Sequence, residues 1–381
     1  MADAKTGASI PYSCEELLAI ARKETGIDLY DSEALEPASV LLDSFNREGE
    51  LHADGAKSIE RRFVRLLSNR LRMRRDIAAH PEILDQTVKA PIIVCGIGRS
   101  GSTKTQGLLA ASGDFNWLPY WQVFNPSLFT GDRSESPQPR IQEAEKFCAY
   151  FDRMSPDNKK GHHFQAHNAE EESMILEHSL RTPCFMGWAP LPSYLTWVMR
   201  QDLSAQIFWL RDTLKYLQWQ GLADSNKRWV LKSPLYSGME PLLLQAFPDA
   251  SLTMTHRTPA ATIPSGIRLM ETFFAPFRDA QPDGQSYAHA MAAALDAHLA
   301  SRASMPANTF YDIDFRRLVT DTANVLREIY AFADAPLTEQ SLKRMIDWDA
   351  SNPEAKFGKH VYSLEQFGLT NDGIERDFAP Y

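Results

Sequence analysis

Residues 91–105 read Pro91-Ile-Ile-Val-Cys-Gly-Ile-Gly-Arg-Ser-Gly-Ser-Thr-Lys-Thr105. The segment opens with a short, continuous apolar run that ends at Gly96, which is typical of a strand buried on both faces of a parallel sheet. Gly, Ser and Thr dominate the next residues, and a helix is expected to begin near Gly107. A buried strand, a glycine-rich loop and a helix in this order predict an α/β fold whose first loop binds an anion.

The loop Gly96–Thr105 has the composition of a phosphate-binding loop. Glycines allow backbone N–H groups to converge on an anion, and a helix start adds partial positive charge. The candidate contacts are Arg99, Ser100, Gly101, Ser102, Thr103 and Lys104. In a Walker A loop a lysine follows the second glycine, but here Ser102 stands there and Lys104 comes two residues later. The pattern disfavours an ATPase or kinase, and it leaves open a plain turn between strand and helix.

Three further segments predict the remaining strands of the sheet. They are residues 228–234, 251–255 and 309–313. A helix expected from Met239 to Phe247 joins the first two of these strands, and this makes a βαβ unit. The predicted fold class is α/β, with a parallel sheet flanked by helices in the manner of P-loop NTPases.

The domain organisation follows from the position of the strands. Residues 1–88 are predicted to form a helical N-terminal region, and residues 89–381 the α/β domain. Within that domain, residues 115–222 are expected to be a mostly helical insertion that holds the acceptor site, because substrate sites vary most in such insertions. In residues 56–80, apolar residues recur at helical spacing among many arginines, which we expect to form a solvated face.

Composition excludes several classes of protein. The formal net charge of −9 argues against nucleic acid as the main partner. The four cysteines form no CxxC pair, so a reducing compartment is the simplest interpretation. We see no signal peptide and no apolar run long enough for a membrane span, and therefore expect a cytoplasmic protein. Whether it forms a homo-oligomer is left open.

Four blocks of sequence resemble the bacterial sulfotransferases that use 3′-phosphoadenosine 5′-phosphosulfate (PAPS). The loop Ile97–Thr103 is similar to the family's Pro-Arg-Ser-Gly-Thr-Thr loop, which binds the 5′-phosphosulfate. The segments 228–234, 247–250 and 256–259 resemble the central block of the family. Residues 358–368 look like its closing segment. Two residues depart from the pattern: Gly98 replaces the loop proline, and Tyr236 replaces a histidine that commonly follows Lys-Ser-Pro.

The resemblance implies roles for several residues. In the family an arginine, and a serine eight residues later, hold the nucleotide 3′-phosphate, and Arg257 and Ser265 have that spacing. Arg99 and Lys104 would hold the 5′-phosphosulfate, although Lys104 could equally be an exposed residue of the first helical turn. Lys232, at a strand end, would contact the bridging oxygen of the leaving group. Lys359 and His360 would close over the nucleotide.

The catalytic base has several candidates. Glu171 and Glu172 lie in an acidic triplet that we expect to open a helical stretch, and related sulfotransferases use glutamate as base. Tyr236 is an alternative contributor. The spacing of His163 and His167 allows a metal site, but the mechanism needs none, and we predict no metal.

The predicted function is transfer of a sulfuryl group from PAPS to a hydroxyl or amine of a small, hydrophobic acceptor. A P-loop kinase or nucleotidase that uses ATP is one alternative, and a non-catalytic nucleotide-binding relative is another. The clustered tryptophans favour an apolar or aromatic acceptor only weakly, because most of them are expected in the core.

Overall fold

The computed structural model describes residues 7–353 and 363–381 and contains one parallel sheet of four strands in these ranges. The strands are β1 (Ile92–Cys95), β2 (Val230–Lys232), β3 (Ser251–His256) and β4 (Phe310–Asp314). Their order across the sheet is β2-β1-β3-β4, and every neighbouring pair is parallel. The four strands predicted from the sequence are confirmed, each to within a residue or two at its ends.

Both faces of the sheet are buried, as the continuous apolar run of β1 predicted. Ile92 and Val94 point into one core, which they share with α4 (Ser102–Ala111) and the helices after β4. Ile93 and Cys95 point the other way, into a larger core. Because alternate residues of a strand face opposite sides, a strand covered on both faces must be apolar throughout.

The strand order creates a crevice at the carboxyl ends of β1 and β3. The chain leaves β1 for β2 on one side, whereas it leaves β3 for β4 on the other. Neighbouring strands whose connections diverge in this way leave a gap outside the sheet, where open α/β folds bind their ligands. The loops after Cys95 and His256, which carry the predicted phosphate contacts, meet at this point.

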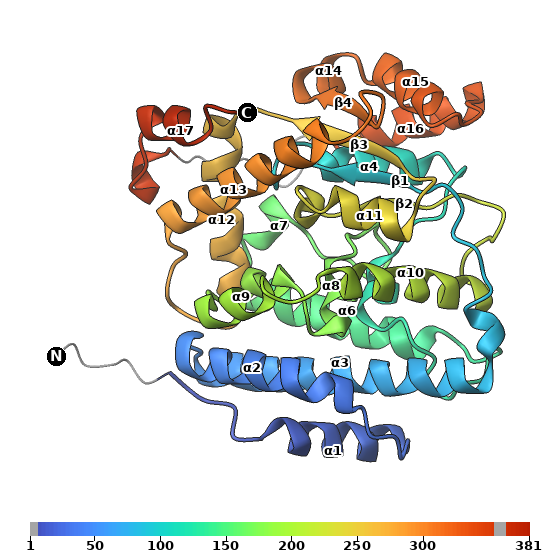
Figure 1. The fold of residues 1–381 in the computed structure, drawn as a ribbon, viewed down its shortest axis with the longest axis vertical. Helices are drawn as coiled ribbons and strands as arrows, with labels where there is room; N and C mark the ends of the chain where they lie inside the picture. The colour runs from blue at the N-terminus through green and yellow to red at the C-terminus, as the bar shows by residue number, and fades with distance from the viewer. Residues whose placement is uncertain (1–6, 354–362) are drawn as a thin grey trace.

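Three helices form the N-terminal layer at the bottom of Figure 1: α1 (Cys14–Thr25), α2 (Ser32–Glu48) and α3 (Ala53–Ala79). The side chain of Ser13 accepts a hydrogen bond from the backbone N–H of Glu16, and the carboxylate of Glu16 accepts one from the backbone N–H of Ser13. This capping box fixes the start of α1. The three helices account for most of the described residues before β1.

The arginines of α3 correct one expectation, because several are buried rather than solvated. Arg62 donates to both carboxylate oxygens of Glu177, at 2.8 and 2.6 Å. Arg70 does the same with Asp31, at 2.6 and 3.2 Å. Burial also lowers the pKa of Arg65 to about 10. Helical periodicity marks the apolar stripe, but it cannot show that distant carboxylates will meet the arginines beside it.

A middle layer of helices lies between the sheet and the N-terminal helices (Figure 1). It contains α5 (Tyr120–Phe124), α6 (Gln138–Met154), α7 (Asn158–Gly161), α8 (Ser173–Leu176), α9 (Pro192–Val198) and α10 (Ser204–Trp219), with 3₁₀ turns at Glu177–Ser179 and Pro183–Gly187. Residues 162–172 break the helical span that was expected here. The Glu170–Glu172 triplet precedes α8: Glu170 N–H bonds Leu118 O at 2.9 Å, and Glu172 is the N-cap of the helix.

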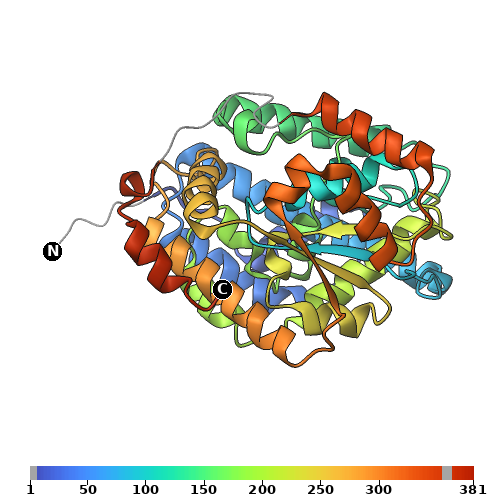
Figure 2. The same ribbon diagram turned by 90° about the horizontal axis from the view of Figure 1, so that it is seen from above.

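The remaining helices surround the sheet, as the view from above shows (Figure 2). They are α11 (Glu240–Ala246), α12 (Pro259–Phe274), α13 (Gly284–Ala303), α14 (Phe315–Thr320), α15 (Thr322–Phe332), α16 (Glu339–Ser351) and α17 (Asn371–Asp377), with 3₁₀ turns at Pro81–Ile83, Pro234–Tyr236 and Glu365–Phe367. α4, α15 and α16 pack on one face of the sheet, and α11, α12 and α13 belong to the core of the other.

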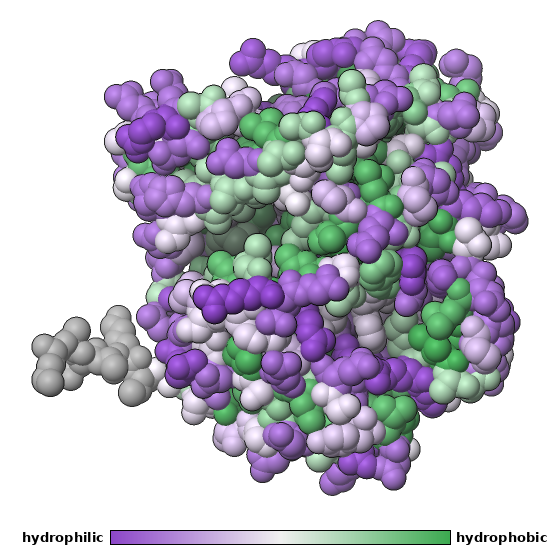
Figure 3. All heavy atoms as spheres, in the orientation of Figure 1, coloured by the Kyte–Doolittle hydropathy of each residue, from purple (hydrophilic) through white to green (hydrophobic). Residues whose placement is uncertain are grey.

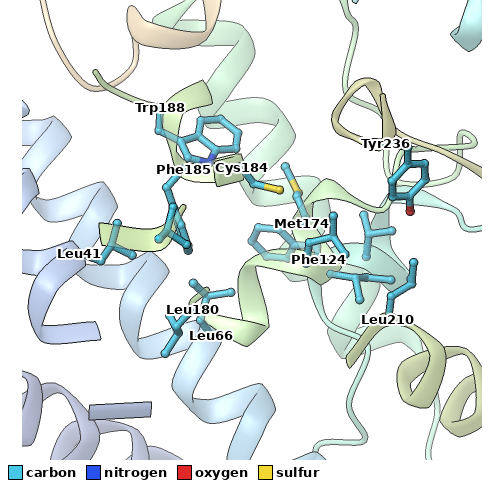
Figure 4. Packing of buried hydrophobic residues seen from close by; sticks show 14 of the residues in the cluster. Leu41, Leu66, Phe124, Met174, Leu180, Cys184, Phe185, Trp188, Leu210 and Tyr236 are labelled. Atoms are coloured by element: carbon cyan, nitrogen blue, oxygen red, sulfur yellow. The ribbon is translucent and has the colours of Figure 1, made fainter. Parts of the chain in front are cut away.

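One hydrophobic core joins the N-terminal helices to the sheet. Figure 4 shows it running from Leu41 and Leu66, on α2 and α3, past Met174 and Phe185 to Tyr236 beyond β2. All of these residues except Met174, at 4% exposed, are no more than 1% exposed. The segment that carries the acidic triplet is thus packed from both sides, which fixes where its carboxylates can lie.

Candidate active site

The first position of the loop after β1 requires glycine. Gly96 has φ +132°, and a Cβ there would lie 2.2 Å from Thr255 Oγ1. The hydroxyl of Ser100 lies 2.7 Å from the same Thr255 oxygen and donates to Ile97 O at 2.6 Å. The loop is thereby tied to β3, and α4 begins directly after it at Ser102. The first N–H groups of a helix have no intrahelical acceptor, so this end is suited to an anion.

Three of the predicted nucleotide contacts lie together at the β1/β3 crevice. Arg99 Nε donates to Ser265 Oγ at 3.0 Å, and Arg257 Nη1 lies 3.4 Å from Arg99 O. Ser265 is 7% exposed and lies on α12, whereas Arg99 and Arg257 are partly buried. The guanidinium of Arg257 also stacks over the ring of Phe315 at 4.1 Å. Two cations from separate strand ends therefore share one site with a hydroxyl.

Tyr287 of α13 belongs to the same region, and no sequence pattern pointed to it. A Cβ on Gly266 would lie 2.1 Å from the Tyr287 hydroxyl oxygen, and one on Gly98 would lie 3.6 Å from it. Burial raises the pKa of Tyr287 to about 12, and the charge of Arg99 opposes the rise. The phenol can therefore donate a hydrogen bond into the crevice at neutral pH.

Other predicted nucleotide contacts lie elsewhere or outside the described residues. Lys104 forms a short ion pair with Asp349 of α16, so in this structure its charge is directed to that helix. Ser102 is buried, whereas Thr103 is exposed at the first turn of α4. Lys359 and His360 lie outside the described residues.

Lys232 ends β2 and is surrounded by acidic side chains. It is 2% exposed, and its Nζ lies 2.7 Å from Glu171 Oε2. Its backbone N–H donates to Glu172 Oε2 at 2.7 Å, and Tyr236 donates its hydroxyl to the same oxygen at 2.9 Å. Ser173 Oγ donates to Glu171 Oε1 at 2.8 Å. The residues predicted as catalytic, Lys232, Glu171, Glu172 and Tyr236, are thus in mutual contact.

The two glutamates differ sharply in protonation. Burial raises the pKa of Glu172 to about 8, although hydrogen bonds from Tyr236 and the Lys232 backbone limit the rise. Burial acts on Glu171 in the same direction, but the charges of Lys232 and His162 and the hydrogen bonds from Lys232 and Ser173 together outweigh it, so the pKa of Glu171 lies below its usual value. Burial alone would lower the pKa of Lys232, yet the charges of Glu171 and Glu170 raise it. At pH 7 the lysine and Glu171 are charged, whereas Glu172 is mostly protonated.

A histidine that the sequence did not single out for catalysis completes the group. His162 Nε2 lies 2.9 Å from Glu170 Oε2, and the side chains are 14% and 6% exposed. The neighbouring Gly161 O accepts a hydrogen bond from Arg99 Nη1 at 2.9 Å. The only signal in the sequence was the cluster of histidines and glutamates between 162 and 172, which also suggested a metal.

The described residues offer no metal site: in 7–353 and 363–381, no three His, Cys, Asp or Glu residues are grouped to hold an ion. His163 and His167 do not share a helical face, because residues 162–172 are not helical. Instead, His163 lies 3.4 Å from Asp152 and His167 lies 4.0 Å from Glu145. No helix in the described ranges has both the length and the apolar character of a membrane span.

The surface is hollowed near α7, the short helix that directly precedes His162. Figure 3 shows a depression over α7 and beside α12, bordered by hydrophobic residues. A separate cavity of about 570 Å³ lies between the start of α3 and the end of α12, lined by His52, Asp54, Glu271 and Arg278 among others. None of the strand-end residues lines that cavity, so we do not assign it to the reaction.

Comparison with known proteins identifies the class to which this site belongs. The sequence model of the sulfotransferase family matches residues 91–339, and the chain therefore belongs to this family. The matched range begins just before β1 and includes the whole sheet and the strand-end residues described above. No curated protein sequence matches the chain.

Two solved structures are similar over nearly the whole chain. Sulfotransferase STF1 from Mycobacterium tuberculosis H37Rv is 27% identical with a TM-score of 0.78, and the match covers 99% of this chain and 100% of that one. Sulfotransferase STF9 from Mycobacterium avium is 25% identical with a TM-score of 0.83, and the match covers 100% and 97%. The α/β fold with its P-loop-like sheet, and sulfotransfer as the type of activity, follow from these likenesses together with the family match.

Proposed function

We propose that this protein transfers a sulfuryl group from PAPS to a hydroxyl or amine of a small acceptor. The observation that carries the proposal is the meeting of Arg99, Arg257 and Ser265 in the β1/β3 crevice. One phosphate loop would suit many nucleotides. A second cationic group at the end of β3 suits a nucleotide with phosphate at both ends, because an arginine fork matches phosphate oxygens.

The residues present fit the donor. The loop Ser100–Thr103 and the start of α4 would hold the 5′-phosphosulfate with backbone N–H groups and hydroxyls. Arg257 and Ser265 would hold the 3′-phosphate, and Arg99, which contacts Ser265, would lie between the two phosphate groups. Lys104 would join them only if it left Asp349. Lys359 and His360 remain predicted contacts.

Lys232 would stabilise the leaving group. Sulfuryl transfer, like phosphoryl transfer, depends on positioning and on stabilising the charge that develops on the departing phosphate. The Lys232 ammonium is buried and needs a negative partner, which is Glu171 in this structure. We propose that the bridging oxygen of PAPS takes the place of Glu171, while Glu172 and Tyr236 keep the Lys232 backbone in position.

The acceptor would enter from the hollow of Figure 3. Glu171 and His162 are titratable side chains of the group that keep solvent access, at 22% and 14% exposed. The rings of Phe164 and Phe273 pack beside His162, and Trp188 stacks on Phe273, which is partly exposed. This setting favours a small acceptor with an apolar body. The four free, buried cysteines fit a cytoplasmic location.

Calorimetric titration tests the donor assignment. Adenosine 3′,5′-bisphosphate should bind the wild type more tightly than ATP does, and Arg257→Ala should weaken that binding by about ten- to hundredfold, since a charged hydrogen bond contributes about 1.5–3 kcal/mol. Arg316→Ala, which removes an exposed arginine of α14, is the matched control and should change nothing. Tighter binding of ATP, or an Arg257→Ala variant that binds like the wild type, would refute the proposal.

A further inference from the structure

His162 lies where the phosphate loop meets the acidic segment. Its neighbour Gly161 accepts a hydrogen bond from Arg99 Nη1 at 2.9 Å, so the histidine follows directly on the donor site. On its other side the ring reaches Glu170, whose Oε1 accepts the backbone N–H of Glu171 at 2.9 Å. The imidazole therefore lies between the residues proposed to bind the donor and the carboxylate that pairs with Lys232.

Both members of the His162–Glu170 pair are held rigidly. Glu170 O accepts a hydrogen bond from Gln106 Nε2 at 2.9 Å, and this ties the glutamate to α4, the helix of the phosphate loop. The ring centroid of His162 lies 4.6 Å from that of Phe164 and 5.7 Å from that of Phe273, nearly perpendicular to the latter. A base oriented by a second group, with its ring clamped, is the arrangement that general-base catalysis requires.

The hydrogen bond to Glu170 determines which imidazole nitrogen can react. A carboxylate can only accept, so Nε2 carries the proton of the neutral ring and Nδ1 keeps its lone pair. Within the described part of the chain, no residue hydrogen-bonds Nδ1. Of the neighbouring carboxylates, Glu172 is fully buried. Glu171 accepts hydrogen bonds from Ser173 and, until the bridging oxygen of PAPS takes its place, from Lys232. A Glu171→Gln variant therefore distinguishes Glu171 from His162 as the base.

We propose that the His162–Glu170 pair is the general base of the reaction, which rests on the proposed sulfotransferase function. Nδ1 of His162 takes the proton as the acceptor O–H bond breaks, and the oxygen's electron pair forms the new bond to sulfur. The bond from sulfur to the phosphate oxygen breaks, and its electrons leave on adenosine 3′,5′-bisphosphate beside Lys232. Glu170 stabilises the imidazolium, which then releases its proton to water.

The test measures adenosine 3′,5′-bisphosphate formed from PAPS with phenol, 2-naphthol, a primary alkanol or water as acceptor. His162→Ala should lower kcat by about 10²–10³-fold and leave the Kd for adenosine 3′,5′-bisphosphate within twofold of the wild type. Free imidazole should restore at least a tenth of the lost rate, because it can occupy the emptied site. His167→Ala, which removes an exposed histidine nearby, is the control. Glu171→Gln should cost less than tenfold in kcat.

Three results would overturn the assignment. One is a kcat loss below tenfold in His162→Ala. The second is a larger loss that free imidazole does not restore, since such a loss would reflect disturbed packing. If the alanine variant does not fold, the same kcat is measured on His162→Gln, which is closer in size to histidine. The third is a loss above a hundredfold in Glu171→Gln, which would make Glu171 the base. A wild type that prefers ATP in calorimetry would instead defeat the proposed function, and the base assignment with it.

Discussion

The protonated state of Glu172 predicts how the stability of the protein depends on pH. Its carboxyl is fully buried, and burial raises its pKa to about 8 from an ordinary value of 4.5. Oε2 accepts from Tyr236 and the Lys232 backbone, whereas Oε1 has no partner among the described residues. Glutamine has the shape of the protonated acid, so Glu172→Gln keeps both accepted hydrogen bonds and removes only the titration.

The sign follows from proton linkage. Between pH 4.5 and 8 the folded state binds a proton at Glu172 that the unfolded state has lost, so the free energy of unfolding falls as pH rises. The stabilisation that comes from the raised pKa of Glu172 is fully present below pH 4.5 and is lost as the pH rises through 8. At about 1.4 kcal/mol per pH unit, the wild type should lose about 3 kcal/mol between pH 5.5 and 7.5 through this group, and the variant none.

Urea unfolding followed by tryptophan fluorescence would measure this, because the chain has eight tryptophans. The free energy of unfolding of Glu172→Gln minus that of the wild type should increase by about 3 kcal/mol from pH 5.5 to 7.5. Titrating groups that do not interact with Glu172 cancel in this difference. A difference that stays constant within about 1 kcal/mol would show that Glu172 is ionised in the folded protein, and the reasoning on its burial would be wrong.

Three further predictions concern the loop, the leaving group and the N-terminal layer. Gly96→Ala should destabilise the protein by about 2 kcal/mol or more in urea unfolding and weaken binding of adenosine 3′,5′-bisphosphate, because φ is +132° and Thr255 leaves no room for a Cβ. A variant as stable as the wild type would contradict this. Lys232→Met should lower kcat by about 10²–10³-fold with little change in nucleotide Kd, whereas a change confined to KM would exclude the leaving-group role. Arg62→Met should cost about 3–5 kcal/mol of stability, because it leaves the buried Glu177 carboxylate without its cationic partner, with Trp188 Nε1 still donating to it. A loss below about 1 kcal/mol in urea unfolding would show that the pair is dispensable.

The sheet and the glycine-rich loop after β1 could be predicted because their signals are local. Pro91–Gly96 is apolar throughout because β1 is covered on both faces, and the loop is glycine-rich because Gly96 has a backbone conformation that other residues resist. The spacing of Arg257 and Ser265 also reflects local structure, since it carries the chain from the end of β3 into α12. Such features are determined within a few residues, so they can be read before any long-range contact is known.

The environment of each charged side chain was decided by tertiary structure alone. The arginines of α3 look solvated in the sequence, yet Arg62 is buried against Glu177, which lies 115 residues away. Likewise, no spacing in the chain reveals that Glu171 pairs with the Lys232 ammonium, whereas Glu172 accepts from the Lys232 backbone. Nor does it reveal that His162 contacts Glu170, while its neighbour Gly161 contacts Arg99. The sequence by itself determined the α/β sheet and the glycine-rich loop after β1. Only the packing of distant elements decided which carboxylates are charged, which cations are paired and which nitrogen can accept a proton, because desolvation and Coulomb interactions depend on distances that the chain acquires on folding.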